Sequence, residues 1–238
     1  MPEPSRASPA GTRVVCVLGM HRSGTSCLAG TLEEAGLHLG EVVTAAPHNR
    51  KGNRENLRIM ALHEGVLSES GGAWDRPPPS VRWSEQRRAE RDAIIDGYAE
   101  RPVWGFKCPR TLLTVGGWLE AIPELSFVGT FRHPMLVAES LRRRNGDELE
   151  RWIELWVYYN EKLLELRRQE PFPLVCFDWD AETYRRRVAS LVQAMGFEVP
   201  ATFAFFDPEL RHDGAPELPL PPRTRELYAE LTAACRDC

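Results

Sequence analysis

The stretch Val14-Val15-Cys16-Val17-Leu18-Gly19-Met20-His21-Arg22-Ser23-Gly24-Thr25-Ser26 decides the fold of this chain. It joins a short apolar strand to a glycine-containing turn, and a helical pattern at Thr25–Ala35 follows. The two glycines have the spacing of a phosphate-binding loop, G-x-x-x-x-G-x-[ST], whose backbone N–H groups surround phosphate oxygens. The N terminus of the following helix adds partial positive charge. The stretch therefore predicts an anion site at the end of a buried strand.

One position of this loop departs from the nucleoside triphosphatase pattern. Thr25 stands where that pattern has a lysine for the β and γ phosphates, although Arg22 supplies a cation earlier in the loop. A glycine-rich turn between a strand and a helix can also be no more than a turn, and Gly19 and Gly24 alone do not exclude this. The cation and the paired hydroxyls of Thr25 and Ser26 favour the anion site.

Apolar strand candidates alternate with helical patterns along the rest of the chain. The strand candidates are Val14–Leu18, Val103–Phe106, Ser126–Phe131 and Leu174–Phe177. Helices are predicted at 25–35, 55–68, 85–99, 112–121, 134–143, 148–168, 181–195 and around 226–234. Strands that are apolar on both faces and separated by helices indicate a parallel sheet covered on both sides. The predicted class is α/β, a P-loop NTPase-like three-layer fold with a central parallel sheet flanked by helices.

Length and composition limit the organisation of the chain. The 238 residues suffice for one substantial core and are few for two full domains. Residues 1–12, rich in Pro, Ser and Ala, are predicted to be a disordered tail, and 13–238 a single domain. No stretch near the start is apolar enough for a secretory signal or a membrane span, so we expect a cytoplasmic protein.

Charge and cysteine content narrow the classes of partner. The net charge is -4, which gives no global attraction to nucleic acid or to an anionic membrane. The short basic runs Arg142–Arg144 and Arg185–Arg187 are expected to be solvated helix faces. Six cysteines fit buried thiols in a reducing compartment. Cys235 and Cys238 form a C-x-x-C, but no second pair or flanking histidine supports a metal or redox site there.

The loop resembles a known family more closely than it resembles the triphosphatases. His21-Arg22-Ser23-Gly24-Thr25-Ser26 resembles the 5'-phosphosulfate loop, P-[KR]-S-G-T-[ST], of sulfotransferases that use 3'-phosphoadenosine 5'-phosphosulfate (PAPS). The resemblance implies that Arg22 contacts the sulfuryl group, and that Ser23, Gly24, Thr25 and Ser26 hold the 5'-phosphate. His21 replaces the usual proline, as in bacterial members. The implied reaction is in-line sulfuryl transfer from PAPS to an acceptor hydroxyl or amine, with 3',5'-adenosine bisphosphate (PAP) as product.

A second motif follows the strand Ser126–Phe131. Arg132 lies at the end of that strand, where open parallel sheets bind their ligands, and Ser140 comes eight residues later. This spacing resembles the 3'-phosphate motif of the same family and implies that Arg132 and Ser140 bind the 3'-phosphate. Arg144, one helical turn beyond Ser140, could assist. The alternative is that Arg132 forms a surface ion pair and Ser140 is an ordinary helix residue.

A further cation follows the strand Val103–Phe106. Lys107 begins the segment Lys107-Cys108-Pro109-Arg110, which resembles K-D-P-[RF] in bacterial and tyrosylprotein sulfotransferases, whose lysine helps to neutralise the transition state. Cys108 replaces the aspartate of that motif. A surface lysine is the alternative. Sulfuryl transfer needs orientation and charge stabilisation, which side-chain cations can supply, so we expect no metal. Asp178, after Leu174–Phe177, is the one weak candidate for a magnesium ligand.

The acceptor must lose a proton, so a carboxylate or histidine is expected as general base. The segment His48–Asn56 resembles N-P-x-G-x-x-E, which follows the first helix in bacterial relatives. Glu55 is the first candidate base and His48 the second. The alternative is that Glu55 is only an acidic residue in the first turn of a helix, where the helix dipole favours it.

Other functions and the nature of the acceptor stay open at this point. A nucleotide or small-molecule kinase would share the loop but should have a lysine at position 25 and a metal carboxylate, and a non-catalytic nucleotide-binding module would lack a base. The acceptor is a small molecule, a glycan or a peptide, with no nucleic-acid partner expected. Trp74, Trp83, Trp118 and the loop Arg76–Pro79 either line an acceptor cleft or belong to ordinary packing.

Overall fold

The computed structural model describes residues 12–47, 49–208 and 219–235. Of the predicted tail, only Thr12 falls within these ranges. His48 and Cys238 lie outside the described residues.

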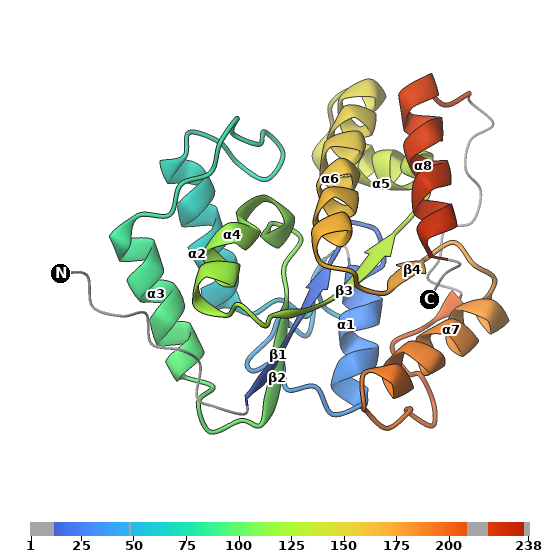
Figure 1. The fold of residues 1–238 in the computed structure, drawn as a ribbon. Coiled ribbons are helices and arrows are strands. Elements are labelled where there is room, and N and C mark those ends of the chain that lie inside the picture. Colours follow the sequence, from blue (N-terminus) through green and yellow to red (C-terminus); the bar gives the residue numbers. More distant parts are fainter. Residues whose placement is uncertain (1–11, 48, 209–218, 236–238) are drawn as a thin grey trace.

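A parallel sheet of four strands forms the centre of the described structure (Figure 1). Its order is β2-β1-β3-β4. The strands are β1 (Arg13–Leu18), β2 (Val103–Lys107), β3 (Ser126–Phe131) and β4 (Leu174–Cys176). The register pairs Leu18 with Gly129, Val17 with Lys107 and Phe131 with Cys176, so all four carboxyl ends lie along one edge of the sheet. The predicted central parallel sheet is confirmed.

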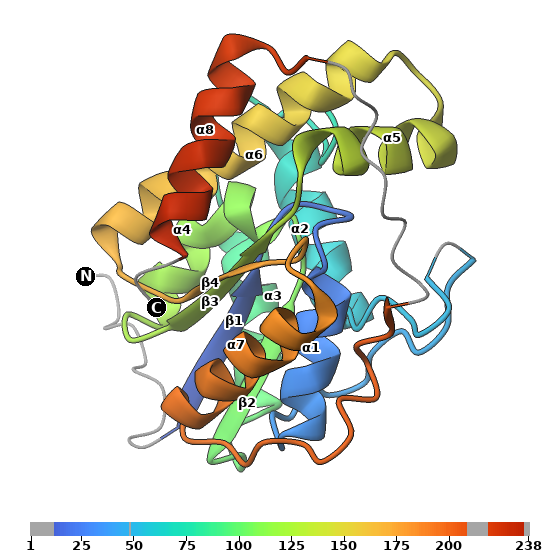
Figure 2. The ribbon, with the colours of Figure 1, turned by 90° about the vertical axis from the view of Figure 1, so that its right-hand side faces the viewer.

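Helices cover both faces of the sheet (Figures 1 and 2). Val15 and Val17 of β1 pack into the core with α1 (Thr25–Glu34) and α7 (Ala181–Ala194). Cys16 belongs to the opposite core, as expected for alternating strand residues. The helices that contribute to that core are α2 (Leu57–Glu69), α3 (Glu85–Asp96), α4 (Thr111–Ala121), α5 (Pro134–Asn145), α6 (Leu149–Gln169) and α8 (Pro222–Ala234). The predicted three-layer architecture is confirmed.

Most predicted boundaries lie within three residues of the observed ones, and the differences have local causes. The helix expected from Glu55 begins at Leu57, because the Asn56 side chain caps it by accepting hydrogen bonds from the N–H groups of Arg58 (2.9 Å) and Ile59 (3.3 Å). The last helix begins at Pro222, before the expected residue 226, with proline in its first turn. The strand expected to end at Phe177 ends at Cys176.

Two of the three tryptophans considered for an acceptor cleft lie in the core. The Trp118 Nε1–H donates to His63 Nε2 at 2.7 Å, and the Trp83 Nε1–H donates to the Thr114 carbonyl at 3.2 Å. Both indoles pack among α2, α3 and α4, so each buries its apolar rings while its one polar group is satisfied. They are ordinary core packing.

We expect His63 to make the fold acid-sensitive. Burial, with Arg110 nearby, lowers the pKa of His63 to about 3, whereas the unfolded chain titrates near the usual value of 6.5. At a pH between these two values, His63 is protonated in the unfolded chain and neutral in the folded chain. The free energy of unfolding therefore falls as the pH decreases below about 6.5, by about 1.4 kcal/mol per pH unit. Urea unfolding at pH 6.5 and 5 should show about 2 kcal/mol more loss in the parent than in His63→Gln. Parallel pH profiles for the two proteins would contradict this prediction.

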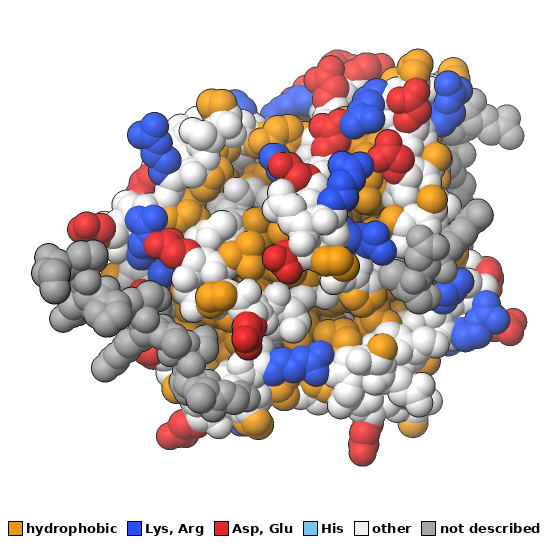
Figure 3. Space-filling view, in the orientation of Figure 1, with side chains coloured by type: hydrophobic (Ala, Val, Ile, Leu, Met, Phe, Trp, Pro, Cys, Tyr) orange, Lys and Arg blue, Asp and Glu red, His pale blue; other side chains and the backbone are white. Residues whose placement is uncertain are grey.

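Basic and acidic side chains are interspersed on the face seen in Figure 3, and its described residues form no continuous basic stripe. The arginines of the two predicted basic runs also contact different kinds of partner. Arg142 pairs with Glu139 at 3.0 Å, whereas Arg185 and Arg187 lie over the rings of Phe206 and Trp179. Arg142 thus has a carboxylate partner on its own helix, and Arg185 and Arg187 each pack against an aromatic ring.

Two further findings concern the membrane and cysteine predictions. Within the described ranges, no helix combines the length and the apolar character needed to cross a bilayer. The described cysteines are free thiols, namely Cys16, Cys27, Cys108, Cys176 and Cys235.

Candidate active site

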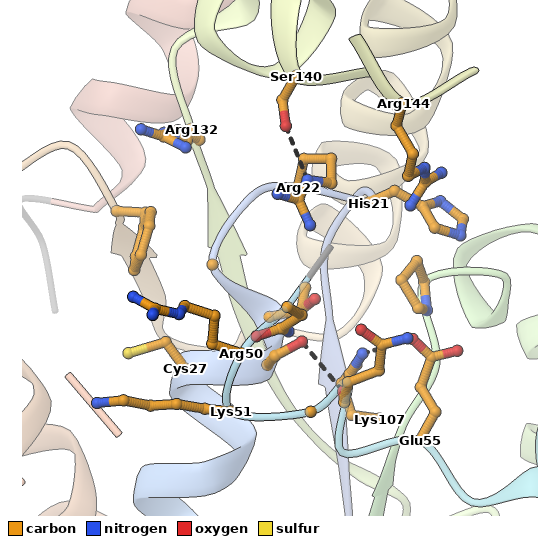
Figure 4. Close-up of a pocket in the computed structure, with 18 of the residues that line it drawn as sticks. His21, Arg22, Cys27, Arg50, Lys51, Glu55, Lys107, Arg132, Ser140 and Arg144 are labelled. Carbon is orange, nitrogen blue, oxygen red and sulfur yellow. Dashed lines mark hydrogen bonds and ion pairs between the residues drawn. The ribbon is translucent and has the colours of Figure 1, made fainter. Parts of the chain in front are cut away.

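A cavity of about 490 Å³ lies at the carboxyl ends of the strands, where open parallel sheets bind ligands. Its volume falls in the range of about 300–1,000 Å³ that is usual for ligand sites. Eight of the residues predicted from sequence line it: Arg22, Gly24, Thr25, Ser26, Glu55, Lys107, Arg132 and Ser140. Figure 4 shows several of them converging from different elements. His48 lies outside the described residues, and Ser23 does not reach the cavity wall.

The loop between β1 and α1 has the backbone of an anion-binding turn. Arg22 (φ 67°) and Gly24 (φ 85°) both adopt left-handed conformations, and such turns bring successive N–H groups into a concave surface. A Cβ atom at Gly24 would lie 2.3 Å from the Phe177 ring, so the loop requires glycine there. No side chain of the described residues caps the N terminus of α1, which leaves the positive end of the helix directed at the cavity.

Ser23, unlike the other predicted residues of the loop, does not line the cavity. It is fully buried, and its hydroxyl has no hydrogen-bond partner among the described residues. Its carbonyl accepts a hydrogen bond from Thr130 Oγ1 at 3.0 Å, and its N–H donates to the Met20 carbonyl at 3.3 Å. These contacts fix the loop against β3.

The two predicted phosphate motifs are joined by a direct hydrogen bond. The Arg22 Nε–H donates to Ser140 Oγ at 2.8 Å, although 118 residues separate them in the chain. Burial lowers the pKa of Arg22 to about 10, and repulsion from Arg144, Arg132 and Arg143 adds to the shift. A cation held in this environment is stabilised by an anionic ligand.

Arg132 lies at the same cavity, directly after β3. Its side chain is 9% exposed, and its Nε lies 3.3 Å from Asp178 Oδ1. Asp178 also accepts the backbone N–H of His133. Arg132 thus forms the ion pair that the alternative predicts, but it does so as a buried residue that lines the cavity and not as a surface residue.

Lys107 and Glu55 form a buried ion pair in the cavity wall. Lys107 Nζ lies 2.6 Å from Glu55 Oε1, with 1% and 7% of the two side chains exposed, so the surface-lysine alternative is wrong. Glu55 precedes α2, so it is not a first-turn helix residue either. Its Oε2 lies 3.4 Å from Arg110 Nη1. Cys108 stays a neutral thiol beside this pair, because burial raises its pKa to about 11 and the Glu55 carboxylate adds to the shift.

The cavity contains cations that the sequence analysis did not assign. Arg110 belongs to the Lys107 segment, and Arg50 and Lys51 belong to the segment that contains Glu55. Their closeness in sequence to predicted site residues could have identified them as cavity residues. Seven lining residues are basic, namely Arg22, Arg50, Lys51, Lys107, Arg110, Arg132 and Arg144, and two are acidic, Glu55 and Asp207. The described lining therefore favours a ligand with several negative charges.

His21 and Trp74 also line the cavity. The sequence made Trp74 a candidate for an acceptor cleft, whereas it marked His21 only as the residue in place of proline in the loop. Their ring centroids lie 4.3 Å apart. The loop Arg76–Pro79 does not contribute to the lining. Among the described residues, no three His, Cys, Asp or Glu side chains are grouped so that they could hold a metal ion.

Comparison with solved structures identifies the architecture. The chain matches the sulfotransferase domain of the Synechococcus PCC 7002 olefin synthase with a TM-score of 0.57 and 17% sequence identity, over 94% of this chain and 97% of that one. The fold is that of a sulfotransferase domain. No protein-family model matches the sequence, and no curated protein matches it.

Two looser matches are also to proteins described as sulfotransferases. The one from Alicyclobacillus acidocaldarius has a TM-score of 0.48 and 15% identity, over 94% of each chain. The one from Mycobacterium tuberculosis H37Rv has a TM-score of 0.44 and 13% identity, over 96% of this chain and 78% of that one. The match to the Synechococcus domain supports the sulfotransferase fold.

Proposed function

We propose that the chain is a PAPS-dependent sulfotransferase that transfers a sulfuryl group to an acceptor hydroxyl or amine. The observation that carries the proposal is the hydrogen bond from Arg22 to Ser140, because it joins the two motifs that resemble the 5'- and 3'-phosphate sites of one nucleotide. Both motifs lie at the carboxyl ends of neighbouring strands and line one cation-rich cavity. We propose further that 13–238 form one domain, and that the free thiols reflect a cytoplasmic location.

The residues of the loop fit the 5'-phosphate. The uncapped N terminus of α1 and the hydroxyls of Thr25 and Ser26 would bind it, with Gly24 allowing the close approach of the backbone. Ser26 Oγ donates to the Asn53 carbonyl at 3.0 Å, so its proton would have to leave that carbonyl to reach a phosphate oxygen. Thr25 and the backbone N–H groups would therefore be the main donors.

Arg132 and Ser140 fit the 3'-phosphate. Ser140 Oγ accepts from Arg22, so its own O–H can donate to a phosphate oxygen. The Arg132 guanidinium brings charge to the same wall. This second anion site would distinguish PAP and PAPS from AMP and ATP.

Besides these two sites the chain offers charge stabilisation and a base. The bound donor supplies an activated sulfuryl group on a phosphate leaving group. Arg22 and Lys107 would stabilise the negative charge that develops on the oxygens of the reacting centre. Glu55 would accept the acceptor proton, and its bonds to Lys107 and Arg110 hold the carboxylate in place.

A kinase is disfavoured by the loop itself. Thr25 occupies the lysine position of the triphosphate-binding pattern, and Asp178 directs its carboxylate to Arg132 and to the His133 N–H. A non-catalytic nucleotide-binding module is disfavoured because Glu55 and Lys107 face the same cavity as the phosphate loop.

The test is incubation of the full chain with PAPS carrying radioactive sulfur and a panel of phenol, amine, sugar, lipid and peptide acceptors. We expect label on at least one acceptor class with an equal amount of PAP released. ATP with magnesium should not be consumed. Binding and turnover of ATP, with no binding of PAPS or PAP, would refute the proposal in favour of a kinase.

A further inference from the structure

The cavity has an end that the two phosphate sites do not use. Arg132 and Arg144 lie on opposite sides of the Arg22–Ser140 pair (Figure 4). Arg144, which the sequence made a candidate to assist the 3'-phosphate site, points toward His21 and away from Arg132. We call the end of the cavity around His21, Trp74, Arg110 and Arg144 the distal end.

Arg144 is a cation without a matching carboxylate at the distal end. Lys107 pairs with Glu55 at 2.6 Å, and Arg110 pairs with Glu64 at 2.8 Å. No carboxylate of the described residues forms an ion pair with Arg144. Its guanidinium lies 5.3 Å from the centroid of the Trp74 ring, and its Nε–H donates to the Asn145 side chain at 2.6 Å. The distal end therefore has one uncompensated positive charge.

His21 is a buried polar side chain at the same place with unused hydrogen-bonding capacity. It is 8% exposed, and neither Nδ1 nor Nε2 has a hydrogen-bond partner among the described residues. Burial lowers the pKa of His21 well below its usual value, and repulsion from Arg110, Arg144, Lys107 and Arg22 lowers it further. A neutral imidazole has one donor and one acceptor nitrogen, and a buried group of this kind is normally paired.

Together these features describe a subsite for a ligand with an oxyanion and a hydroxyl group. An arginine held against an indole face is preorganised for planar carboxylate or phosphate oxygens. The imidazole beside it can accept the hydrogen bond of a hydroxyl group or donate to the anion. The subsite adjoins Lys107 and Glu55, where the acceptor would react in the proposed function.

We propose that the distal end binds an acceptor that carries its own anionic group, a carboxylate or a phosphate ester, close to the hydroxyl that receives the sulfuryl group. Arg144 binds the anion, and His21 binds the hydroxyl. The assignment of the ligand as an acceptor rests on the proposed sulfotransferase function. The preference of the distal end for an anionic ligand does not depend on that function.

Calorimetric titration tests the preference with three probes of similar shape: 3-hydroxybenzoate, its methyl ester and 3-hydroxyphenyl phosphate. Each is titrated into the full chain with and without saturating PAP. We expect one or both anions to bind about 10-fold or more tightly than the neutral ester, the ratio that one charge-assisted hydrogen bond supplies. Arg144→Gln should reduce this ratio to about 3-fold or less and leave PAP affinity unchanged. Arg143→Gln, an exposed neighbour on α5, should keep the ratio.

The outcomes separate this proposal from the proposed function. Equal binding of the ester and both anions, absence of binding by all three probes, or an unchanged ratio in Arg144→Gln would overturn the anionic subsite. Failure of PAP to bind would count against the sulfotransferase assignment, while the titrations without PAP would still decide the subsite. In the parent protein, His21→Phe should weaken 3-hydroxybenzoate more than it weakens benzoate, and an equal loss for both would remove the hydroxyl contact.

Discussion

Replacement of Arg22 by alanine is expected to lower kcat for sulfuryl transfer by about 10³-fold, the effect of removing a cation that stabilises charge in the transition state. Arg22 belongs to the phosphate loop, and its Nε–H bond to Ser140 holds it against the second motif. Because the cation acts where charge develops, the loss should appear mainly in kcat. Steady-state kinetics with labelled PAPS measures the effect.

Two variants make this result specific. Arg22→Lys keeps the charge but loses the planar fork, so it should retain more activity than Arg22→Ala. Arg186→Ala removes an exposed arginine on α7 and should behave as the parent. If Arg22→Ala kept kcat within about 10-fold of the parent, Arg22 would have no role at the reacting centre.

The second large effect is expected for Glu55→Gln. The amide oxygen can still accept from Lys107, but the side chain can no longer take a proton, so kcat should fall about 10²- to 10⁴-fold. PAP should still bind, because Glu55 is placed at the acceptor side of the cavity.

Stability must be measured on the same variant. Lys107 is buried, and removal of the partner of a buried charge costs about 3–5 kcal/mol. Rates are therefore compared per folded molecule, using urea unfolding to determine the folded fraction. Glu120→Gln is the matched control, because Glu120 also lies near two arginines, Arg88 (2.9 Å) and Arg91 (3.4 Å), but outside the cavity. Near-normal turnover by Glu55→Gln would remove it from the role of base.

The sequence predicted what depends on local spacing. The glycines of the loop and Thr25 identified a strand, a turn and a helix, and Arg132 was placed at a strand end by the apolar stretch before it. Because parallel strands bring their carboxyl ends to one edge, these segments were expected to meet, and the register of β1 with β3 brings them together. Arg22 and Ser140 need only this topology to come into contact.

Some features of the site depend on tertiary contacts and could not be predicted from the sequence. Glu55 and Lys107 are 52 positions apart, so their ion pair could not be inferred from spacing. The sequence predicted that α2 starts at Glu55, but the Asn56 side chain caps the helix, which therefore begins at Leu57. Trp74 faces the cavity whereas Trp83 and Trp118 face the core, and nothing in their local sequence distinguishes these positions. Ser23 fits the motif, yet its hydroxyl points into the protein.

The most direct test compares the affinities of PAP, AMP and ATP with magnesium by calorimetry, in the parent and in Arg132→Ala. If Arg132 and the loop bind the two phosphates of one nucleotide, PAP should bind at least about 100-fold more tightly than AMP, since two charge-assisted hydrogen bonds supply that ratio. Arg132→Ala should remove most of this difference and leave AMP affinity nearly unchanged. Equal affinity of the parent protein for PAP and AMP, or an Arg132→Ala variant that still prefers PAP as strongly, would contradict the two-phosphate site.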